Sequence, residues 1–326
     1  DLFTNVDVSP INGITSYIMN NGDMLNKGFS ISLNGYPVKT KNFRWYMSTY
    51  YSVNLNKVQT DDARNYNLND YLNGTAVVSG QPISTFYSYK FLGLNPQNGA
   101  PMFDDWEDRW HLLQGKTLDE VVPMILVNSG TRDPKFSGDL NNTFTYKSWS
   151  LSLNFSYSLG SKVRLFEMYG PIINGISAAA NVREEFLDRW QVPGDEKYTV
   201  YPSIISPSSP DYEHYRLHYS APQRAVGPNS GVPAFANNVW QMYDDSDLRV
   251  VSGNYLKLQS LSFSYRLNDR LLRKTPFTQL SISFNTHNCF TISAKELRGQ
   301  DPSQAGFADA GLSIRPSYTI GLNVSF

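Results

Sequence analysis

Residues 149–159 alternate apolar and small polar side chains more strictly than any other stretch of the chain. Large apolar residues stand at every odd position from Trp149 to Leu159, and serines or one asparagine stand between them. Successive side chains of a β-strand point to opposite faces, so this pattern predicts a strand with one apolar face and one small polar face. The stretch is also longer than the roughly 5–6 residues of an ordinary soluble strand and matches the ~9–11 residues that cross a bilayer.

The same alternation recurs along much of the chain, and no stretch shows a helical pattern of comparable length. Further apolar files occupy most alternate positions in 43–55, 261–267, 280–284 and 318–326, whereas a helical candidate such as 183–190 is short. Aromatic residues lie near the strand ends, as at Phe43, Trp149 and Tyr318, where membrane barrels carry aromatic girdles. We therefore predict an all-β fold, and within it a transmembrane antiparallel β-barrel.

The segments between the expected strands fall into two length classes. The links at 146–148 and 267–276 are compact, whereas 57–82, 103–135, 160–250 and 288–315 are long, irregular and rich in Pro, Gly, Asn and aromatic residues. Outer-membrane barrels alternate short periplasmic turns with long extracellular loops. We therefore expect the four long segments to be extracellular loops of one barrel domain that occupies 1–326.

Composition agrees with a barrel and argues against several other classes. The 28 Lys and Arg nearly balance the 29 Asp and Glu without any basic block, which argues against a nucleic-acid groove. The single Cys289 excludes an intrachain disulfide scaffold. Charged residues make up only 17% of the chain, because the polar files carry Ser, Asn and Thr, which suit a watery lumen. Neither of the glycine-rich nucleotide-binding motifs is present.

Both ends of the chain favour a segment of a longer barrel. Asp1 follows neither an initiator Met nor a signal peptide, and the chain ends on Phe326 in its last expected strand. About eight to ten strands are expected here, whereas plugged transport barrels have ~22. Each open edge of a partial sheet in a bilayer would leave on the order of ten backbone groups unpaired, at several kcal/mol apiece. We therefore expect a preceding segment to complete the sheet.

Six segments, in order along the chain, resemble the SusC/RagA type of TonB-dependent outer-membrane transporter of Bacteroidota. They are the strand start at 21–28, the hairpin at 86–101, the DPKFSG strand start at 133–138, the RW and PGD loop at 188–195, the YLKL strand at 252–258 and the NCFT and GQDP segments within 288–302. The chain departs from the family pattern at Asp139, Lys257 and Cys289, where the family usually has Gly, Arg and Leu.

This resemblance covers the whole chain but only about the C-terminal third of the family's length, so the plug and the N-terminal extension are absent. It implies import of oligosaccharides or peptides across the bacterial outer membrane, with a SusD-like surface lipoprotein as lid. It also implies contact with TonB through the absent segment, with the remaining barrel and plug, and with outer-membrane lipid. Phe326 is similar to the C-terminal signal that barrels present to the barrel-assembly machinery. No enzymatic activity and no cofactor are expected.

The candidate substrate or partner residues lie in two of the long loops. They are Asp104, Asp105, Trp106, Asp108, Trp110, Arg189 and Trp190. An acidic and aromatic cluster can bind a sugar by ring stacking and hydrogen bonds, or hold calcium, and it can equally be a solvated loop that packs on a partner. We expect no metal at His214 and His218, because ligands four residues apart need a helix and Pro210 precedes them in a loop.

Two other classes of function remain open from the sequence. A soluble β-sandwich adhesin or glycan-binding module also has strands with one apolar face, and it would need no detergent. An outer-membrane enzyme would need a carboxylate or Ser/His cluster, but nothing in the sequence places two such groups at a defined distance. Long strands, long loops and the ordered motifs favour the transporter.

Overall fold

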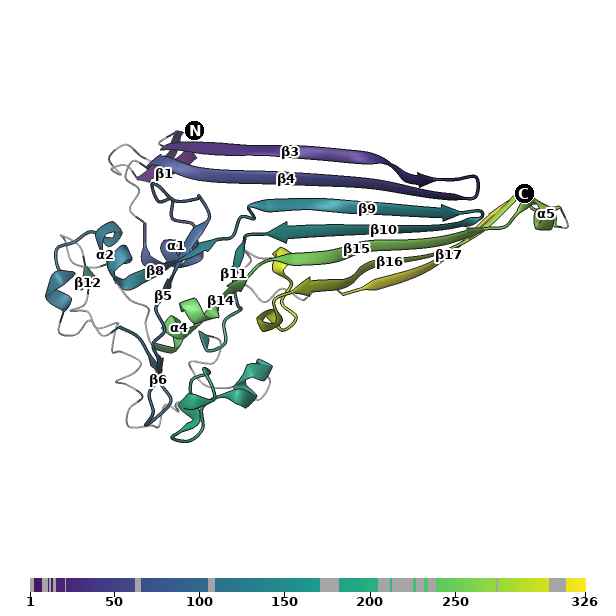
Figure 1. The fold of residues 1–326 in the computed structure, drawn as a ribbon. Coiled ribbons are helices and arrows are strands. Elements are labelled where there is room, and N and C mark those ends of the chain that lie inside the picture. The colour runs from purple at the N-terminus through teal and green to yellow at the C-terminus, as the bar shows by residue number, and fades with distance from the viewer. Residues whose placement is uncertain are drawn as a thin grey trace. The chain divides into compact units, whose positions relative to one another are not determined.

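The structure is a computed structural model of the 326-residue chain. The residues that it describes are 3–7, 11, 13, 16–20, 22–61, 66–104, 109–170, 182–204, 212, 225–226, 232–233, 239–273, 275–304 and 315–326. They divide into two compact units (Figure 1). The sheet unit comprises Asn26–Leu55, Asp133–Val163 and Ser252–Phe326, and the loop unit comprises Asp1–Leu25, Asn56–Arg132 and Arg164–Val251.

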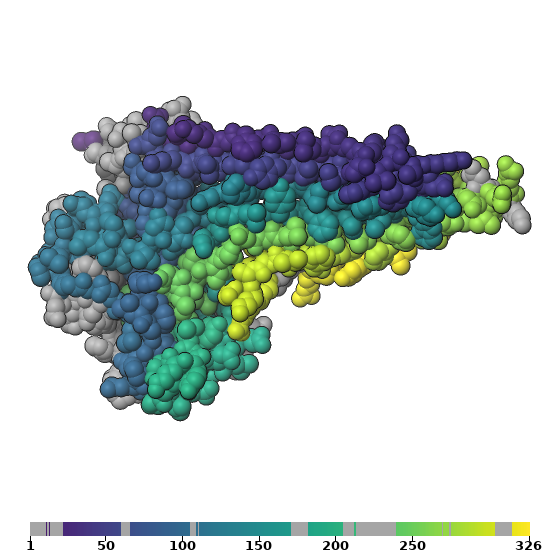
Figure 2. All heavy atoms as spheres, viewed as in Figure 1, coloured from purple at the N-terminus to yellow at the C-terminus, as the bar shows by residue number. Residues whose placement is uncertain are grey.

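A seven-stranded sheet dominates the sheet unit, with the strand order β17-β16-β15-β10-β9-β4-β3. Its strands are β3 (Gly22–Lys39), β4 (Phe43–Asp61), β9 (Phe136–Tyr146), β10 (Trp149–Leu159), β15 (Tyr255–Arg266), β16 (Gln279–Ser293) and β17 (Ser317–Ser325). From β4 to β17 every neighbouring pair is antiparallel. In Figure 2 their side chains form one continuous surface from purple β3 to yellow β17. The prediction of an all-β fold is confirmed.

The alternating stretches became strands for the reason that the pattern predicts. β10 has the bounds of the alternating stretch, Trp149–Leu159, and β17 covers nearly all of 318–326. Lys147 adopts a left-handed φ of 52° and, with Ser148, joins β9 to β10 by a tight turn. The link from β15 to β16 holds only the short helix α5 (Asp269–Leu272). Neighbours in the chain are thus neighbours in the sheet wherever a link is short.

One bulge corrects the phase of β15. The apolar residues of this strand stand at odd positions from Leu261 onward but at even positions in Leu256 and Leu258. The register with β10 and with β16 shifts between these two groups, at Gln259. An extra residue in one strand moves the following side chains to the other face. Gln259 therefore returns the even-numbered leucines to the face that carries Leu261.

The loop unit has short elements and an aromatic core. Its helices are α1 (Leu68–Asn73), α2 (Leu118–Ile125) and α4 (Val239–Asp244), and its strands include β5 (Thr85–Tyr89), which pairs with β8 (Leu126–Thr131), and β6 (Gly93–Leu94), which pairs with β7 (Pro101–Met102). Tyr243 packs edge-on against Tyr169 and Phe91, with ring centroids 5.4 and 5.6 Å apart.

The remaining described elements are brief. They are β1 (Phe3–Asp7), β2 (Ser16–Asn20), β11 (Lys162–Arg164), β12 (Ala225–Val226), β13 (Val232–Pro233), β14 (Val250–Ser252) and the 3₁₀ turns Trp110–Leu112, Glu184–Asp188, Asp195–Lys197, Asp247–Arg249, Lys295–Leu297 and Pro302–Gln304. The helix expected near 183–190 is thus one 3₁₀ segment. Across the described ranges, no helix has the length and apolar character needed to cross a membrane.

Candidate functional site

One face of the sheet is mostly apolar from β4 to β17, because the registers align the apolar files of successive strands. One row across six strands, from β4 to β17, consists of Trp45, Phe144, Leu151, Phe263, Phe284 and Ile320. The next row consists of Phe43, Tyr146, Trp149, Tyr265, Ile282 and Leu322. Many of these side chains are exposed, with Ile320 at 79% and Leu322 at 62%. Such a large exposed apolar face marks a surface that contacts lipid or another apolar partner.

The opposite face is built mostly from polar side chains, many of them small. The row one residue along from the first apolar row consists of Tyr46, Thr143, Ser152, Ser262, Asn285 and Thr319. Neighbours in this row bond across strands: the Thr143 and Ser152 hydroxyls lie 3.1 Å apart, and the Ser262 hydroxyl donates to Asn285 Oδ1 at 2.6 Å. Two chemically opposite faces on one sheet are the arrangement of a barrel wall between lipid and water.

Two of the exceptions on the apolar face, Asn142 and Gly138, are accommodated locally. Asn142 is buried there, and the Trp45 indole Nε1 donates to its Oδ1 at 3.0 Å. Gly138 lies in register between Tyr51 and Tyr157. A Cβ at Gly138 would overlap both the Tyr157 phenol and the carbonyl of Tyr50. The glycine of the DPKFSG segment therefore makes room for an aromatic ring that lies across the strand.

A buried ion pair joins two of the segments that carry the family resemblance. Lys257, from the YLKL strand, projects from the polar face, and its Nζ lies 2.9 Å from Oδ2 of Asp301 in the GQDP segment. Burial alone would raise the pKa of Asp301. Hydrogen bonds from Ser303 and Lys257, with the charge of Lys257, outweigh that effect and hold the pKa below its usual value. Lys257 therefore fastens the loop after β16 to β15.

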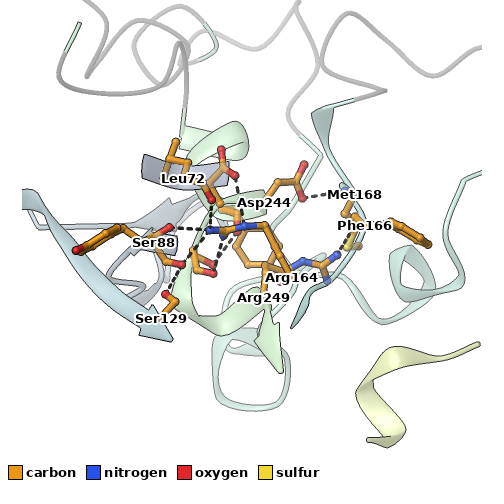
Figure 3. Close-up of polar contacts among 12 residues, drawn as sticks. Leu72, Ser88, Ser129, Arg164, Phe166, Met168, Asp244 and Arg249 are labelled. Carbon is orange, nitrogen blue, oxygen red and sulfur yellow. Dashed lines mark hydrogen bonds and ion pairs between the residues drawn. The ribbon is translucent and has the colours of Figure 1, made fainter. Parts of the chain in front are cut away.

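In the loop unit, a buried guanidinium joins segments that are far apart in the sequence (Figure 3). Arg164 Nη2 donates to the carbonyl oxygens of Tyr87 at 2.7 Å and Leu72 at 3.3 Å. The same nitrogen donates to the Ser88 hydroxyl at 3.1 Å, and Nε lies 3.8 Å from the Asp245 carboxylate. One side chain thus donates hydrogen bonds to the end of α1 and to β5, and it pairs with a carboxylate just after α4.

The neighbouring Asp244 acts as the matching acceptor. Its carboxylate accepts hydrogen bonds from the three consecutive backbone amides of 168–170, each at 2.8 Å. Burial raises the pKa of Asp244 to about 6, although the charge of Arg249 and the three amides oppose that rise. Arg249 itself donates to the Phe166 carbonyl at 2.6 Å. The Asp244 carboxylate thus ties the amides of 168–170 to the end of α4, beside the ring contact between Tyr169 and Tyr243.

Trp190, a predicted substrate or partner residue, is buried in the loop unit. Gly99, from the hairpin segment, has a left-handed φ of 70°, and a Cβ there would overlap the indole of Trp190. The Gly99 carbonyl accepts a hydrogen bond from the Ser203 amide at 2.9 Å, and the Trp190 amide donates to Tyr201 at the same distance. Two more of the resembling segments therefore pack on each other.

The other predicted site residues are placed as follows. Asp104 forms an exposed ion pair with Arg109 at 2.5 Å, and Arg189 is half-buried with Nη1 donating to the Phe186 carbonyl at 2.8 Å. Asp105, Trp106 and Asp108 lie outside the described residues, as do His214 and His218, and the side chain of Trp110 is likewise not described. Phe326 lies just past the end of β17 and packs edge-on against Phe277, with ring centroids 5.2 Å apart. Their roles stay predictions.

Sequence reasoning missed the buried cluster of Arg164, Asp244, Asp245 and Arg249. It lies within 160–250, which the sequence presents as one long irregular segment. One signal was available, since two acids and an arginine stand close to the aromatic pair Trp240 and Tyr243 in a chain with few charges. Within the described residues, no three His, Cys, Asp or Glu side chains gather in a way that could hold a metal ion.

Comparisons with known proteins point in one direction. No family model matches the chain. It is 23% identical over 96% of its length to TonB-dependent receptor P3 of Formosa agariphila and 21% identical over its full length to TonB-dependent receptor P39 of the same organism. It covers 30% and 33% of these two proteins, so it spans about a third of the curated relatives that it matches.

Solved structures give the same fold. The full chain matches 32% of a chain in the structure of the RagAB peptide transporter, with a TM-score of 0.64 and 17% identity. It also matches 32% of a chain of the RagAB peptide importer in the closed-closed state, with a TM-score of 0.65 and 18% identity. At this identity the likeness shows the fold alone.

Proposed function

We propose that this chain, which is similar to TonB-dependent receptors and resembles the SusC/RagA type, forms the C-terminal wall of an outer-membrane barrel that imports nutrients. The observation that carries the proposal is the pair of opposite faces on one long-stranded sheet. In the proposed barrel, the row that contains Trp45 and Ile320 faces lipid, and the row that contains Thr143 and Ser152 faces the lumen.

The barrel is closed, in this proposal, by strands outside this chain. β3 and β17 are the edges of the seven-stranded sheet, and among the described residues each has one side without a partner strand in that sheet. Backbone groups in hydrocarbon must be hydrogen-bonded, at several kcal/mol apiece, so both edges need strands. The occupants are the earlier strands of the same barrel, together with the plug that these transporters carry. TonB acts through that absent part, and the segments 57–82, 103–135, 160–250 and 288–315 are the extracellular loops.

Oligosaccharides or peptides are the proposed cargo, and a SusD-like surface lipoprotein is the proposed lid. The RagAB structures are named as those of a peptide transporter, and the curated relatives are named as receptors rather than as enzymes.

The test is uptake by a whole receptor that contains this segment. Cells that express it are supplied with labelled oligosaccharide or peptide pools, with and without TonB, and the detergent extract of their outer membrane is analysed by mass spectrometry. We expect TonB-dependent uptake and co-purification of a surface lipoprotein. Recovery of the chain, folded and alone, in the aqueous fraction would contradict the barrel and favour a soluble glycan-binding sandwich.

A further inference from the structure

The short-turn end of the sheet unit collects an excess of positive charge. Three links join neighbouring strands at this end, at 40–42, 147–148 and 267–278. Together with the four strand residues on either side of each, they hold eight of the chain's 28 Lys and Arg but one of its 29 Asp and Glu. The chain as a whole is nearly neutral, so the excess belongs to this end.

Hydrogen bonds hold the three links side by side. The Lys147 amide donates to the Asn42 carbonyl at 2.9 Å, and the Arg266 amide donates to the Ser148 carbonyl at the same distance. The helix α5 begins shortly after Arg266, and Figure 1 shows it at the same end of the sheet. Cations from separate links therefore form one surface, the basic end, whose described members are Lys39, Lys41, Arg44, Lys147, Arg266, Arg270 and Arg273.

The charges of the basic end are not neutralised by the described part of the chain. All seven side chains are exposed, and no carboxylate among the described residues forms an ion pair with them. Lys147 Nζ lies 5.3 Å from the centre of the Tyr146 ring, and Lys39 Nζ lies 5.4 Å from that of Tyr36. Like charges gathered on one surface repel one another, so this end favours an anionic partner.

The basic end borders an aromatic row of the apolar face. Tyr146 lies in register with Phe43 on one side and Trp149 on the other, and Trp149 lies in register with Tyr265. Tyr and Trp favour the boundary between hydrocarbon and headgroups, because one part of each side chain is apolar and another is polar. In α5, beyond this row, Leu271 is 47% exposed. In the proposed barrel, the cations of the links thus lie at the depth of lipid headgroups.

Alternation separates the cations that can reach lipid from those that cannot. Arg44 and Arg266 each follow a residue of the aromatic row, so they lie on the polar face, toward the proposed lumen. Lys147, Arg270 and Arg273 lie in the links, past the ends of the strands. The Lys147 ammonium is also close to Tyr146, which belongs to the apolar face.

We propose that the basic end binds the headgroups of anionic phospholipid, with Lys147, Arg270 and Arg273 at the phosphates and the aromatic row beside the upper acyl chains. The inference rests on the proposed function, which supplies the membrane, and it adds a class of lipid and the place where that lipid binds. An anionic surface attracts Lys and Arg within about a Debye length, and each cation near it contributes roughly fivefold in affinity.

The experiment measures which lipid the whole receptor retains. The receptor is purified in detergent and inserted into bilayers of phosphatidylethanolamine and phosphatidylglycerol. Native mass spectrometry then counts the lipids that stay bound when the receptor is released. We expect the wild type to retain phosphatidylglycerol over phosphatidylethanolamine by at least about tenfold, and the triple variant Lys147→Gln/Arg270→Gln/Arg273→Gln to reduce that preference to within about twofold of none. Added salt should weaken the preference of the wild type.

The matched control removes the same charge from elsewhere. Lys57→Gln/Lys162→Gln/Lys197→Gln replaces three exposed lysines outside the basic end, and it should keep the wild-type preference. An unchanged preference in the first triple variant would overturn the inference, and so would an equal loss in the control, because net charge alone would then act.

Two further outcomes separate this inference from the proposed function. If the first triple variant unfolds at a lower temperature by the same amount with and without phosphatidylglycerol, the cations pair with acids elsewhere in the receptor, and the lipid site is wrong. TonB-dependent uptake by a wild type that shows no lipid preference would also overturn the lipid site alone. A wild type that inserts into neither bilayer would contradict the proposed function and this inference with it.

Discussion

The sheet unit and the loop unit provide hydrogen-bond partners for their backbone groups in different ways. In the sheet, the backbone groups of each strand are hydrogen-bonded by the neighbouring strands. The side chains alternate between two faces, as the row from Trp45 to Ile320 shows. In the loop unit, charged side chains such as Arg164 replace missing strand partners. The first solution spreads stability over many equivalent pairs, whereas the second concentrates it in a few residues.

The largest expected effect comes from removing the central guanidinium of the loop unit. Arg164→Met leaves the Asp245 carboxylate and the carbonyls of Leu72 and Tyr87 without this partner, and breaking a buried pair typically costs about 3–5 kcal/mol. Hydrogen exchange on the whole receptor should show loss of protection in 68–89 and 239–250, with β9 and β10 unchanged. Lys162→Met, at an exposed cation nearby in the sequence, is the control. Equal loss of protection in the sheet would contradict the separation of the two units.

A charge on the apolar face of the sheet should come next. Leu153→Arg places a cation on the proposed lipid face, which destabilises a barrel by about 2–4 kcal/mol near the middle of a bilayer. Asn154→Arg places the same side chain on the polar face. We expect poor membrane assembly for the first variant and near-normal assembly for the second, measured by heat-modifiable migration and by urea unfolding in lipid. If both variants assemble equally well, the apolar face does not contact lipid.

The packing of Trp190 on Gly99 is tested by a matched pair of glycines. Gly99 and Gly115 have nearly equal left-handed φ values of 70° and 73°, but only a Cβ at Gly99 overlaps another group. Gly99→Ala should therefore cost about 1–3 kcal/mol more than Gly115→Ala, which isolates the overlap from the backbone strain. Thermal unfolding and Trp fluorescence report the difference. Equal costs would mean that Trp190 moves freely aside.

The smallest effect is the pH dependence of the Lys257 and Asp301 pair. Because the folded state lowers the pKa of Asp301, the pair's contribution is fully present above the ordinary Asp value and is lost as the pH falls through the lower, folded value. Stability of the sheet unit should thus be flat, in this respect, from pH 7 to about 4, and decline below that. The difference between wild type and Asp301→Asn, followed against pH, isolates this contribution. A difference that vanishes already near pH 6 would contradict it.

The sequence predicted the sheet better than the loops, and the reason is physical. Period-two alternation encodes face and register together, so the stretch from Trp149 to Leu159 specified its own bounds and its apolar face. The cluster around Asp244 has no such period, since its partners are amides at 168–170 and a guanidinium at 249 that only the fold brings together. The role of the acidic and aromatic residues near Asp104 stays a prediction, because most of them lie outside the described residues.

Resemblance carried information that periodicity did not. Short segments such as YLKL and GQDP say little about the fold when each is taken alone. They are in contact in the structure, because Lys257 and Asp301 form one buried ion pair. The hairpin glycine at 99 and the tryptophan at 190 likewise belong together through one packing contact. A motif pair of this kind reports a long-range contact, which no local pattern can predict.

The bulge at Gln259 lets the apolar residues of β15 change from even to odd positions while they stay on one face of the sheet. Leu258 and Leu261 are an odd number of residues apart yet share a face, and the Gln259 side chain is retained by a 2.7 Å hydrogen bond to the Ser156 hydroxyl. Deleting Gln259 would leave an unbroken alternation with every flanking side chain on its present face. β15 can therefore accommodate a single-residue insertion or deletion at the bulge. The same change in the middle of β10 would move the side chains of half that strand to the opposite face.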